Sequence, residues 1–161
     1  MRKCGVPDRI EYIDYVEKYQ DECGKNEYPF VLTSGVRKPH YFGSEHRNIP
    51  ALRKRQPDPL VTIHPEDAVL KGIAGGDQVR IYSPFGSCVM KAKIGDDFER
   101  GIVHCDYGWW YPEKVQVEGE RFGMRDSNVN ALLPSGLQGP AGFGYPFRCF
   151  VCNIEKAELD R

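Results

Sequence analysis

The chain has 161 residues, 40% of them hydrophobic and 12% aromatic, which suits one globular domain. Its 22 Lys and Arg residues nearly balance 23 Asp and Glu residues, so it lacks the general positive field that non-specific nucleic-acid binding needs. Its apolar runs are far shorter than the ~20 residues of a membrane-spanning helix. We therefore expect no nucleic-acid partner and no membrane insertion.

The cysteines and the N-terminus bear on the compartment. Six cysteines are too sparse in a chain of this size to form a disulfide scaffold, so reduced thiols are expected. No apolar segment follows the basic residues at the start, which excludes a secretory signal in this stretch and favours the cytoplasm. An export signal on a longer N-terminal portion would instead place the protein in the periplasm.

One amphipathic helix is predicted near the N-terminus, from Asp8 to Cys23. Apolar side chains recur there at every third position, which places them along one face of a helix that ends near Gly24. These side chains belong to Ile10, Ile13, Val16 and Tyr19.

The remaining apolar segments are short and rich in β-branched or aromatic residues. They are Tyr28 to Thr33, Leu60 to Ile63, Gln78 to Tyr82, Cys88 to Ile94, Ile102 to Asp106 and Phe147 to Ile154. Six strands separated by Gly and Pro favour a closed or sandwiched β fold.

A short helix and a hairpin are predicted within this β region. The segment HPEDAVLKG has Pro65 near its start, acidic residues in its first turn and Gly72 at its end, as a helix of about two turns would have. The turn Ser83-Pro84-Phe85-Gly86 joins the next two strands as a hairpin.

Two long segments without periodicity run from Gly35 to Pro59 and from Tyr107 to Tyr145. Loops of this length in a compact domain are usually functional or disordered. The first is dense in hydroxyl, Gly and Arg residues, the groups that hold phosphate oxygens, although a solvated surface loop has the same composition. The polar residues here are Thr33, Ser34, Gly35, Arg37, His40, Ser44, Glu45, His46, Arg47 and Asn48.

The second long segment contains aromatic and amide side chains. Trp109 and Trp110 could stack on a planar heterocycle or fill the core. Asn128 and Asn130 could bind a ring edge or cap a turn. Both interpretations remain open from the sequence.

Three other chemistries are compatible with parts of the sequence. Cys149 and Cys152 have the spacing of half a zinc site, but residues three apart on a strand face opposite sides of the sheet. His104 and Cys105 could form a nucleophilic pair, but neighbouring residues on a strand also face opposite sides. Two Gly-Ser steps, at 43–44 and 86–87, would allow self-cleavage to a pyruvoyl group, although Gly-Ser is also ordinary turn sequence.

Five segments in order carry a specific resemblance to a known family. They are YPFVLTSGVRKPHYFGSEHRNIPAL, PDPLVTIHPEDAVLKGIAGGDQVRIYSPFGSCVMKAKI, GIVHCDYGWWYPE, the Asn-x-Leu of 130–132, and GYPFRCFVCNIEK. From about Tyr28 to Lys156 the chain resembles the C-terminal molybdopterin-dinucleotide-binding domain of the dimethyl-sulfoxide-reductase family of molybdenum and tungsten enzymes.

The resemblance implies a mainly β fold, a six-stranded double-psi β-barrel of the aspartate-decarboxylase-like type. Together with the predicted N-terminal helix, it leads us to expect a helical segment over residues 1–26 and a barrel domain over residues 27–161. It also implies bis-molybdopterin guanine dinucleotide (bis-MGD) with Mo or W as the cofactor.

The same resemblance gives the expected site residues. Matches to the family's first loop, together with the polar residues of that loop, give Thr33, Ser34, Gly35, Arg37, His40, Ser44, Glu45 and Arg47. Asn130 matches an Asn that hydrogen-bonds the cofactor, while Trp110 and Arg148 lie in segments that approach it. The chain departs from the family where Gly43 replaces a common His and where Val36 separates the glycine from Arg37.

The family's metal ligand and iron-sulfur cysteines lie in upstream domains, so the chain alone is not expected to catalyse a reaction. It would be the C-terminal piece of a catalytic subunit or a small separate subunit, with an iron-sulfur electron-transfer partner for the whole enzyme. The alternative is a psi-barrel that binds a protein or nucleotide without molybdenum, because fold does not determine function.

Overall fold

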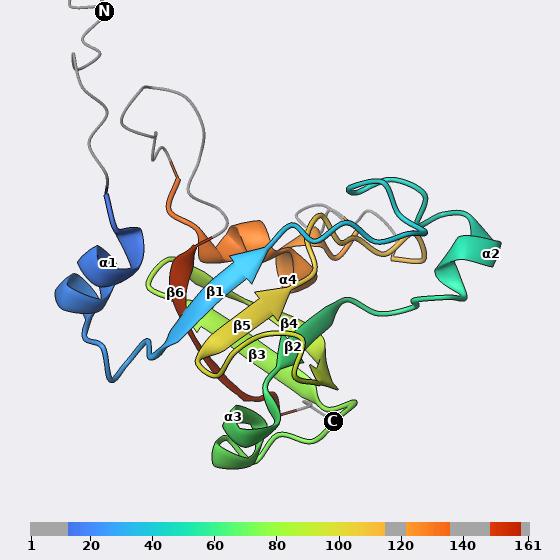
Figure 1. Ribbon diagram of the computed structural model, residues 1–161. Helices are drawn as coiled ribbons and strands as arrows, with labels where there is room; N and C mark the ends of the chain where they lie inside the picture. Colours follow the sequence, from blue (N-terminus) through green and yellow to red (C-terminus); the bar gives the residue numbers. More distant parts are fainter. Residues whose placement is uncertain (1–12, 115–121, 136–148, 159–161) are drawn as a thin grey trace, which may run out of the picture.

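Six strands form a closed β-barrel in the computed structural model, which describes residues 13–114, 122–135 and 149–158 (Figure 1). The strands are β1 (Phe30–Ser34), β2 (Leu60–Ile63), β3 (Gln78–Ser83), β4 (Gly86–Ile94), β5 (Ile102–Cys105) and β6 (Phe150–Lys156). The helices are α1 (Tyr15–Cys23), α2 (Pro50–Arg53), α3 (Pro65–Leu70), α4 (Met124–Ser127) and the 3-10 helix η2 (Val129–Leu132). The predicted mainly β, six-stranded barrel is confirmed.

The strand order around the barrel is β1-β5-β2-β4-β3-β6. Two neighbouring pairs, β1 with β5 and β2 with β4, are parallel, and the other pairs are antiparallel. The predicted hairpin is present, with Ser83 opposite Gly86. Since β6 pairs with both β1 and β3, the sheet closes and leaves no free edge.

Alternating side chains of the strands fill the barrel. The strand β1 shows the pattern clearly, with Phe30 and Leu32 buried and Val31 between them half-buried. Three cysteines, Cys88, Cys105 and Cys152, belong to the same core, and burial raises the pKa of the Cys88 thiol to about 12. These thiols therefore stay protonated and pack as small apolar side chains.

The helix α1 begins later than predicted. Asp14 caps it, since its carboxylate accepts hydrogen bonds from the N–H groups of Val16 and Glu17, both at 3.0 Å. The expected helical start at Asp8 is therefore wrong for residues 13 and 14, while residues 8–12 lie outside the described part. Tyr19 is buried, and its ring packs against that of Phe150 at 4.7 Å, which attaches α1 to the barrel.

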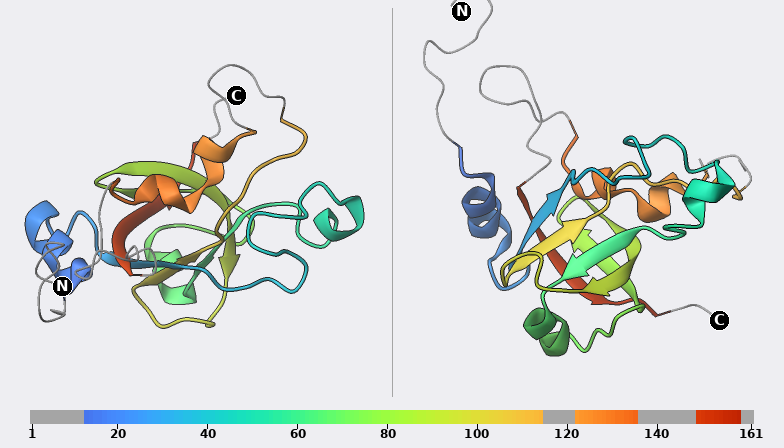
Figure 2. Two further views of the ribbon diagram at one scale, coloured as in Figure 1. Left: turned by 90° about the horizontal axis from the view of Figure 1, so that it is seen from above. Right: turned by 45° about the vertical axis from the view of Figure 1, so that its right-hand side comes forward.

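The predicted helix after β2 is confirmed as α3, at the other end of the barrel from the loop that follows β1 (Figures 1 and 2). The short helices α2, α4 and η2 have no counterpart in the prediction, because four residues are too few to show a period. Across the described ranges, no helix has the length and apolar character needed to cross a membrane.

Candidate functional site

Two loops leave the same end of the barrel. The first loop (residues 35–59) follows β1, and the second loop (residues 107–114) follows β5. Because β1 and β5 are parallel neighbours, with Ser34 opposite Cys105, both chains leave the sheet side by side (Figures 1 and 2). Two segments about 60 residues apart in the sequence therefore meet at one end of the barrel.

Arg47 lies inside the junction of these loops. Its side chain is only 3% exposed, and its guanidinium donates to the carbonyl oxygens of Gly43 at 2.9 Å and Tyr107 at 3.2 Å. The guanidinium carbon lies 4.7 Å from the Tyr41 ring centre and 4.5 Å from that of Trp109. Burial lowers its pKa from the usual value. Its charge thus faces carbonyl oxygens and aromatic rings of the two loops.

Ser44 and Trp110 meet at the surface of the junction. The Trp110 indole N–H donates to the Ser44 carbonyl oxygen at 2.5 Å. Gly108, with φ of 63°, allows this approach, because a Cβ there would lie 3.3 Å from the Ser44 backbone. His46 has φ of 69°, a left-handed conformation that costs a non-glycine residue about 1 kcal/mol. The first loop is therefore held in one specific path over the second.

A buried carboxylate anchors the base of the first loop. Asp106 is 4% exposed; its Oδ1 lies 2.8 Å from Lys38 Nζ, and its Oδ2 accepts the Leu60 N–H at 3.0 Å and the Gln56 side-chain amide. Gln56 in turn lies 3.2 Å from the ring of His40. This group was not predicted, although an Asp directly after a buried strand is a signal for it.

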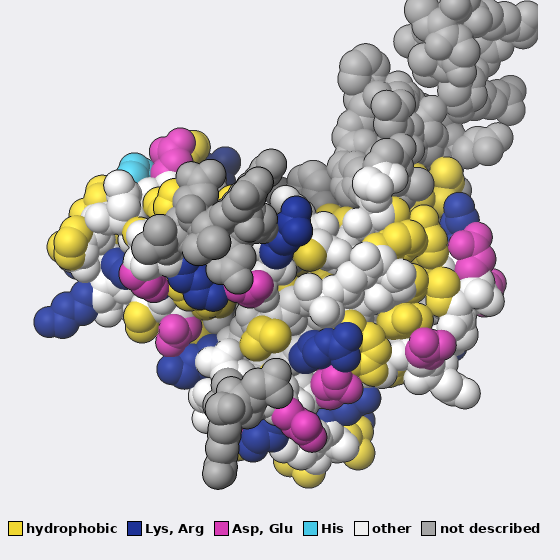
Figure 3. Space-filling model, turned by 180° about the vertical axis from the view of Figure 1, so that it is seen from behind, with side chains coloured by type: hydrophobic (Ala, Val, Ile, Leu, Met, Phe, Trp, Pro, Cys, Tyr) yellow, Lys and Arg dark blue, Asp and Glu magenta, His cyan; other side chains and the backbone are white. Residues whose placement is uncertain are grey.

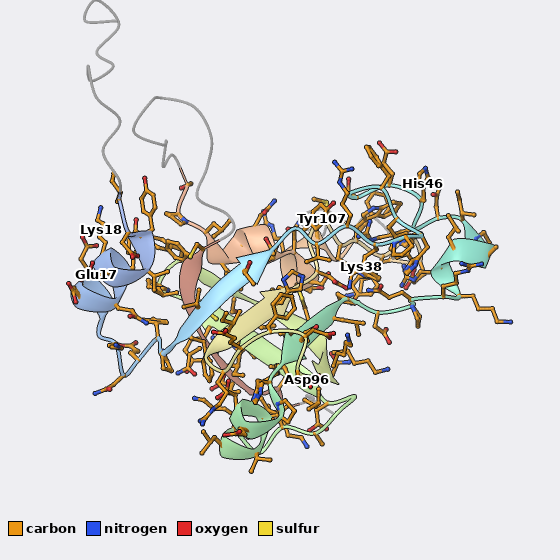
Figure 4. The ribbon with its side chains drawn as sticks, in the orientation of Figure 1. Glu17, Lys18, Lys38, His46, Asp96 and Tyr107 are labelled. Carbon is orange, nitrogen blue, oxygen red and sulfur yellow. The ribbon has the colours of Figure 1, made fainter. Side chains whose placement is uncertain are left out.

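A cavity of about 420 Å³ opens beside the anchored loop. Arg37, Lys38, His40 and His46 line it and supply positive or hydrogen-bonding groups. Figure 4 shows Lys38, His46 and Tyr107 on the loop side of the barrel, and all three line the cavity. On the back face of the molecule, Lys and Arg side chains are interspersed with Asp and Glu side chains (Figure 3). The cavity is suited to an anionic ligand.

Two buried guanidinium nitrogens near this cavity keep free N–H groups. Arg47 Nε and Arg53 Nη1 have no hydrogen-bond partner among the residues that the structure describes. Buried donors without acceptors are rare in folded proteins and call for an explanation such as a missing ligand or water. Neither residue lines the cavity, so these donors point to a tightly packed junction behind its wall.

The other expected site residues lie around the same end. Thr33 and Ser34 end β1, half-buried and buried, and Gly35 follows with φ of 95°. Glu45 is exposed next to Ser44. The exposed Asn130 lies on η2, which packs against β4. Arg148 lies outside the described residues.

The competing chemistries receive no geometric support from the cysteines. Cys149 is exposed while Cys152 is in the core, so the two thiols face apart. Cys105 is in the core and its neighbour His104 packs on Phe98 instead. Within the described ranges, no group of three His, Cys, Asp or Glu residues could hold a metal ion. Burial also raises the pKa of Cys105, which keeps its thiol protonated.

His104 is a buried imidazole beside the Asp106 anchor. It is 3% exposed, stacks on Phe98 at 4.7 Å, and neither ring nitrogen has a hydrogen-bond partner in the described part of the chain. Burial lowers its pKa; the Asp106 carboxylate opposes this shift, while Lys38 and Lys93 add to it. His104 is therefore neutral in the folded protein at neutral pH.

This lowered pKa predicts a pH dependence of stability. Above 6.5, the usual His pKa, the residue is neutral in both states. As the pH falls below 6.5 toward the lower folded pKa, the unfolded chain binds more protons, so the free energy of unfolding falls. The variant His104→Phe keeps a ring on Phe98 and loses this slope. Melting temperatures from about pH 7.5 to about pH 5 test it, and parallel curves for the two proteins would contradict the prediction.

The sequence comparisons place this architecture in a family. The model of the molydopterin dinucleotide binding domain matches residues 30–143, which include both loops and five of the six strands. Among curated proteins, dopamine dehydroxylase of Eggerthella lenta is 35% identical over 131 residues, 81% of this chain. The putative catalytic subunit of a dimethyl sulfoxide reductase from Halobacterium salinarum is 38% identical over 130 residues, also 81% of this chain.

The chain is short beside these relatives. It spans 13% of the dopamine dehydroxylase and 14% of the Halobacterium salinarum protein. Among solved structures, acetylene hydratase from Pelobacter acetylenicus has the same fold, with a TM-score of 0.81 and 22% identity over 91% of this chain and 21% of that chain. Since the family model matches more than half of its length, this chain belongs to the molydopterin dinucleotide binding domain family.

Proposed function

We propose that the cavity beside the joined loops holds the phosphate-bearing part of the molybdopterin guanine dinucleotide. The observation that carries this proposal is the set of cationic and hydrogen-bonding groups that line the cavity, namely Arg37, Lys38, His40 and His46. Guanidinium forks and backbone amides are the donors that bind pyrophosphate oxygens most strongly. The residues present therefore fit the group that the family binds.

The roles of the single residues follow from their positions. Arg37 supplies charge on the cavity wall, Lys38 supplies N–H donors of an ammonium that also pairs with Asp106, and His40, held by Gln56, supplies a ring nitrogen. Ser44 and Glu45 present polar groups where the loops meet. Arg37, Lys38, His40 and Ser44 bind and orient the phosphates, whereas the Glu45 carboxylate, which only accepts hydrogen bonds, takes N–H groups of the cofactor.

Three further residues complete the proposed site. Trp110 offers an aromatic face at the junction, with its N–H fixed on the first loop. The exposed amide of Asn130 and the guanidinium of Arg148 are proposed to bind the same cofactor. Thr33, Ser34 and Gly35 shape the loop start and expose its backbone amides.

The curated relatives are much longer than this chain. We propose that the remaining domains of a catalytic subunit supply the metal ligand, and that an iron-sulfur protein exchanges electrons with it. When bound, the cofactor supplies a Mo or W centre for redox or hydration chemistry, and the protein contributes position and electrostatics. We propose the cytoplasm as its compartment and residues 27–161 as the cofactor domain.

The first test is a nucleotide titration of the chain, with GDP compared with ADP. A ligand that binds only the folded state at a hundredfold excess over Kd stabilises it by about 2.7 kcal/mol. For a chain of this size, the melting temperature should rise by roughly 5 to 10 °C. The variant Arg37→Ala should reduce this rise.

Arg80→Ala is the matched control, because Arg80 is an exposed Arg that pairs with Glu155 on the barrel wall and does not line the cavity. It should leave the GDP shift unchanged. Equal shifts with GDP and ADP, or no effect of Arg37→Ala, would count against the proposed site. Such a result would favour a barrel that binds a protein or another nucleotide.

A further inference from the structure

Arg47 has an unusual environment for a charged residue. It is 3% exposed, and in the described part of the chain no carboxylate lies within ion-pair distance of it. A buried charge is normally paired with an opposite charge. Backbone carbonyls and aromatic faces take that place here, which means that the shape of Arg47 matters as well as its charge.

The partners of Arg47 come from both loops. Tyr41 and Gly43 belong to the first loop, whereas Tyr107 and Trp109 belong to the second. The planar guanidinium lies against two rings and donates at its edge to two carbonyl oxygens. One side chain therefore fixes both the separation and the register of the loops.

This junction supports the surface where the cofactor residues meet. Gly43 precedes Ser44, and Tyr107 precedes Gly108, which packs against Ser44. The indole of Trp110 then bonds to the Ser44 carbonyl oxygen. The position of Ser44 relative to Trp110 thus depends on the two carbonyl groups that Arg47 holds.

We propose that Arg47 is a positioning residue that locks the two loops so that Ser44, Glu45 and Trp110 form one surface, and that its guanidinium does not itself contact the dinucleotide. Its consequence for cofactor binding rests on the proposed function. A lysine cannot replace it, because an ammonium group lacks the planar fork and the stacking face.

Fluorine NMR of the chain labelled with 5-fluorotryptophan tests the lock without any ligand. The chain has two Trp residues and should give two signals, which the variant Trp110→Phe assigns. Arg47→Met should shift or broaden the signal of Trp110, which it does not touch, as well as that of Trp109. Arg47→Lys should do the same, and it keeps the proposal testable if the Met variant fails to fold.

The matched control is Arg80→Met. Arg80 also lies over an aromatic ring, that of Tyr82 at 5.0 Å, but on the barrel wall. The Arg80→Met variant should change neither the Trp109 nor the Trp110 signal. If Arg47→Lys folds and leaves the Trp110 signal unchanged, Arg47 does not lock the loops and the proposal is overturned.

GDP binding by the same variants tests the consequence. Arg47→Lys should weaken binding about tenfold, because a loosened site loses several contacts together. If Arg47 touched phosphate directly, Arg47→Lys would weaken GDP binding without moving the Trp110 signal, and that outcome would overturn the positioning role. If the unmodified chain binds no GDP, the proposed nucleotide site fails, while the lock is still decided by the fluorine signals.

Discussion

Replacing Asp106 by alanine should destabilise the chain by about 3 kcal/mol, because breaking a buried ion pair by removing one partner leaves the other groups uncompensated. The substitution removes the acceptor of the Leu60 N–H, the Gln56 amide and the Lys38 ammonium. The melting temperature should fall by roughly 6 to 12 °C for a chain of this size. Differential scanning calorimetry measures the change.

Asparagine should not restore the stability. The side-chain amide of asparagine has one oxygen and one NH₂ group. In either orientation its NH₂ group would point at another donor, the Lys38 ammonium or the Gln56 amide. The control is Asp97→Ala, which removes an exposed carboxylate paired with Lys93 and should leave the melting temperature nearly unchanged. If Asp106→Ala has the same melting temperature as Asp97→Ala, the buried hydrogen bonds and ion pair of Asp106 do not hold the first loop.

The barrel strands could be predicted from the sequence where local chemistry determined them. The predicted bounds of β2 match the structure, and β3 extends by one residue, because apolar β-branched residues and a flanking Pro or Gly mark these segments. The helix α3 could be predicted from Pro65 and the acidic first turn. The turn residues predicted that β3 pairs with β4, but the other strand pairings are not local information, and only the family resemblance implied the closed barrel.

The start of α1 was predicted wrongly for a definite reason. Period-three spacing continued upstream of Asp14 and suggested a longer helix. The carboxylate of Asp14 instead accepts the first free N–H groups and fixes the helix start. An Asp inside a segment of periodic apolar residues can therefore be the N-cap, and the helix then begins after it.

The site could be predicted in part. The first loop was identified from its polar residues, and Trp110 was assigned to the same cofactor by resemblance alone. Their contact depends on the parallel pairing of β1 with β5, which no local pattern encodes. The inward direction of Arg47 depends on Tyr41 and Trp109, which meet only in the folded chain.

Replacing Gly86 by alanine should also destabilise the chain strongly. A Cβ at this position would overlap the Ala131 carbonyl oxygen, and a backbone atom cannot swing aside as a flexible side chain does. The Ser83 hydroxyl also connects the hairpin to η2, because it donates to the Leu132 carbonyl oxygen at 2.6 Å. Overpacking of this kind costs about 3 kcal/mol. It would push η2 from the barrel and displace Asn130.

Urea unfolding should therefore show a lower midpoint for Gly86→Ala with the same slope, which indicates lost stability in an otherwise similar folded state. Gly75→Ala is the matched control, because the nearest atom to its Cβ would be Ile94 Cγ1 at 3.8 Å, an ordinary contact. That variant should be unchanged or about 0.5 kcal/mol more stable, since alanine restricts the unfolded chain. Equal midpoints for the two variants would mean that η2 moves freely away from β4, and that Asn130 is not held in place by the barrel.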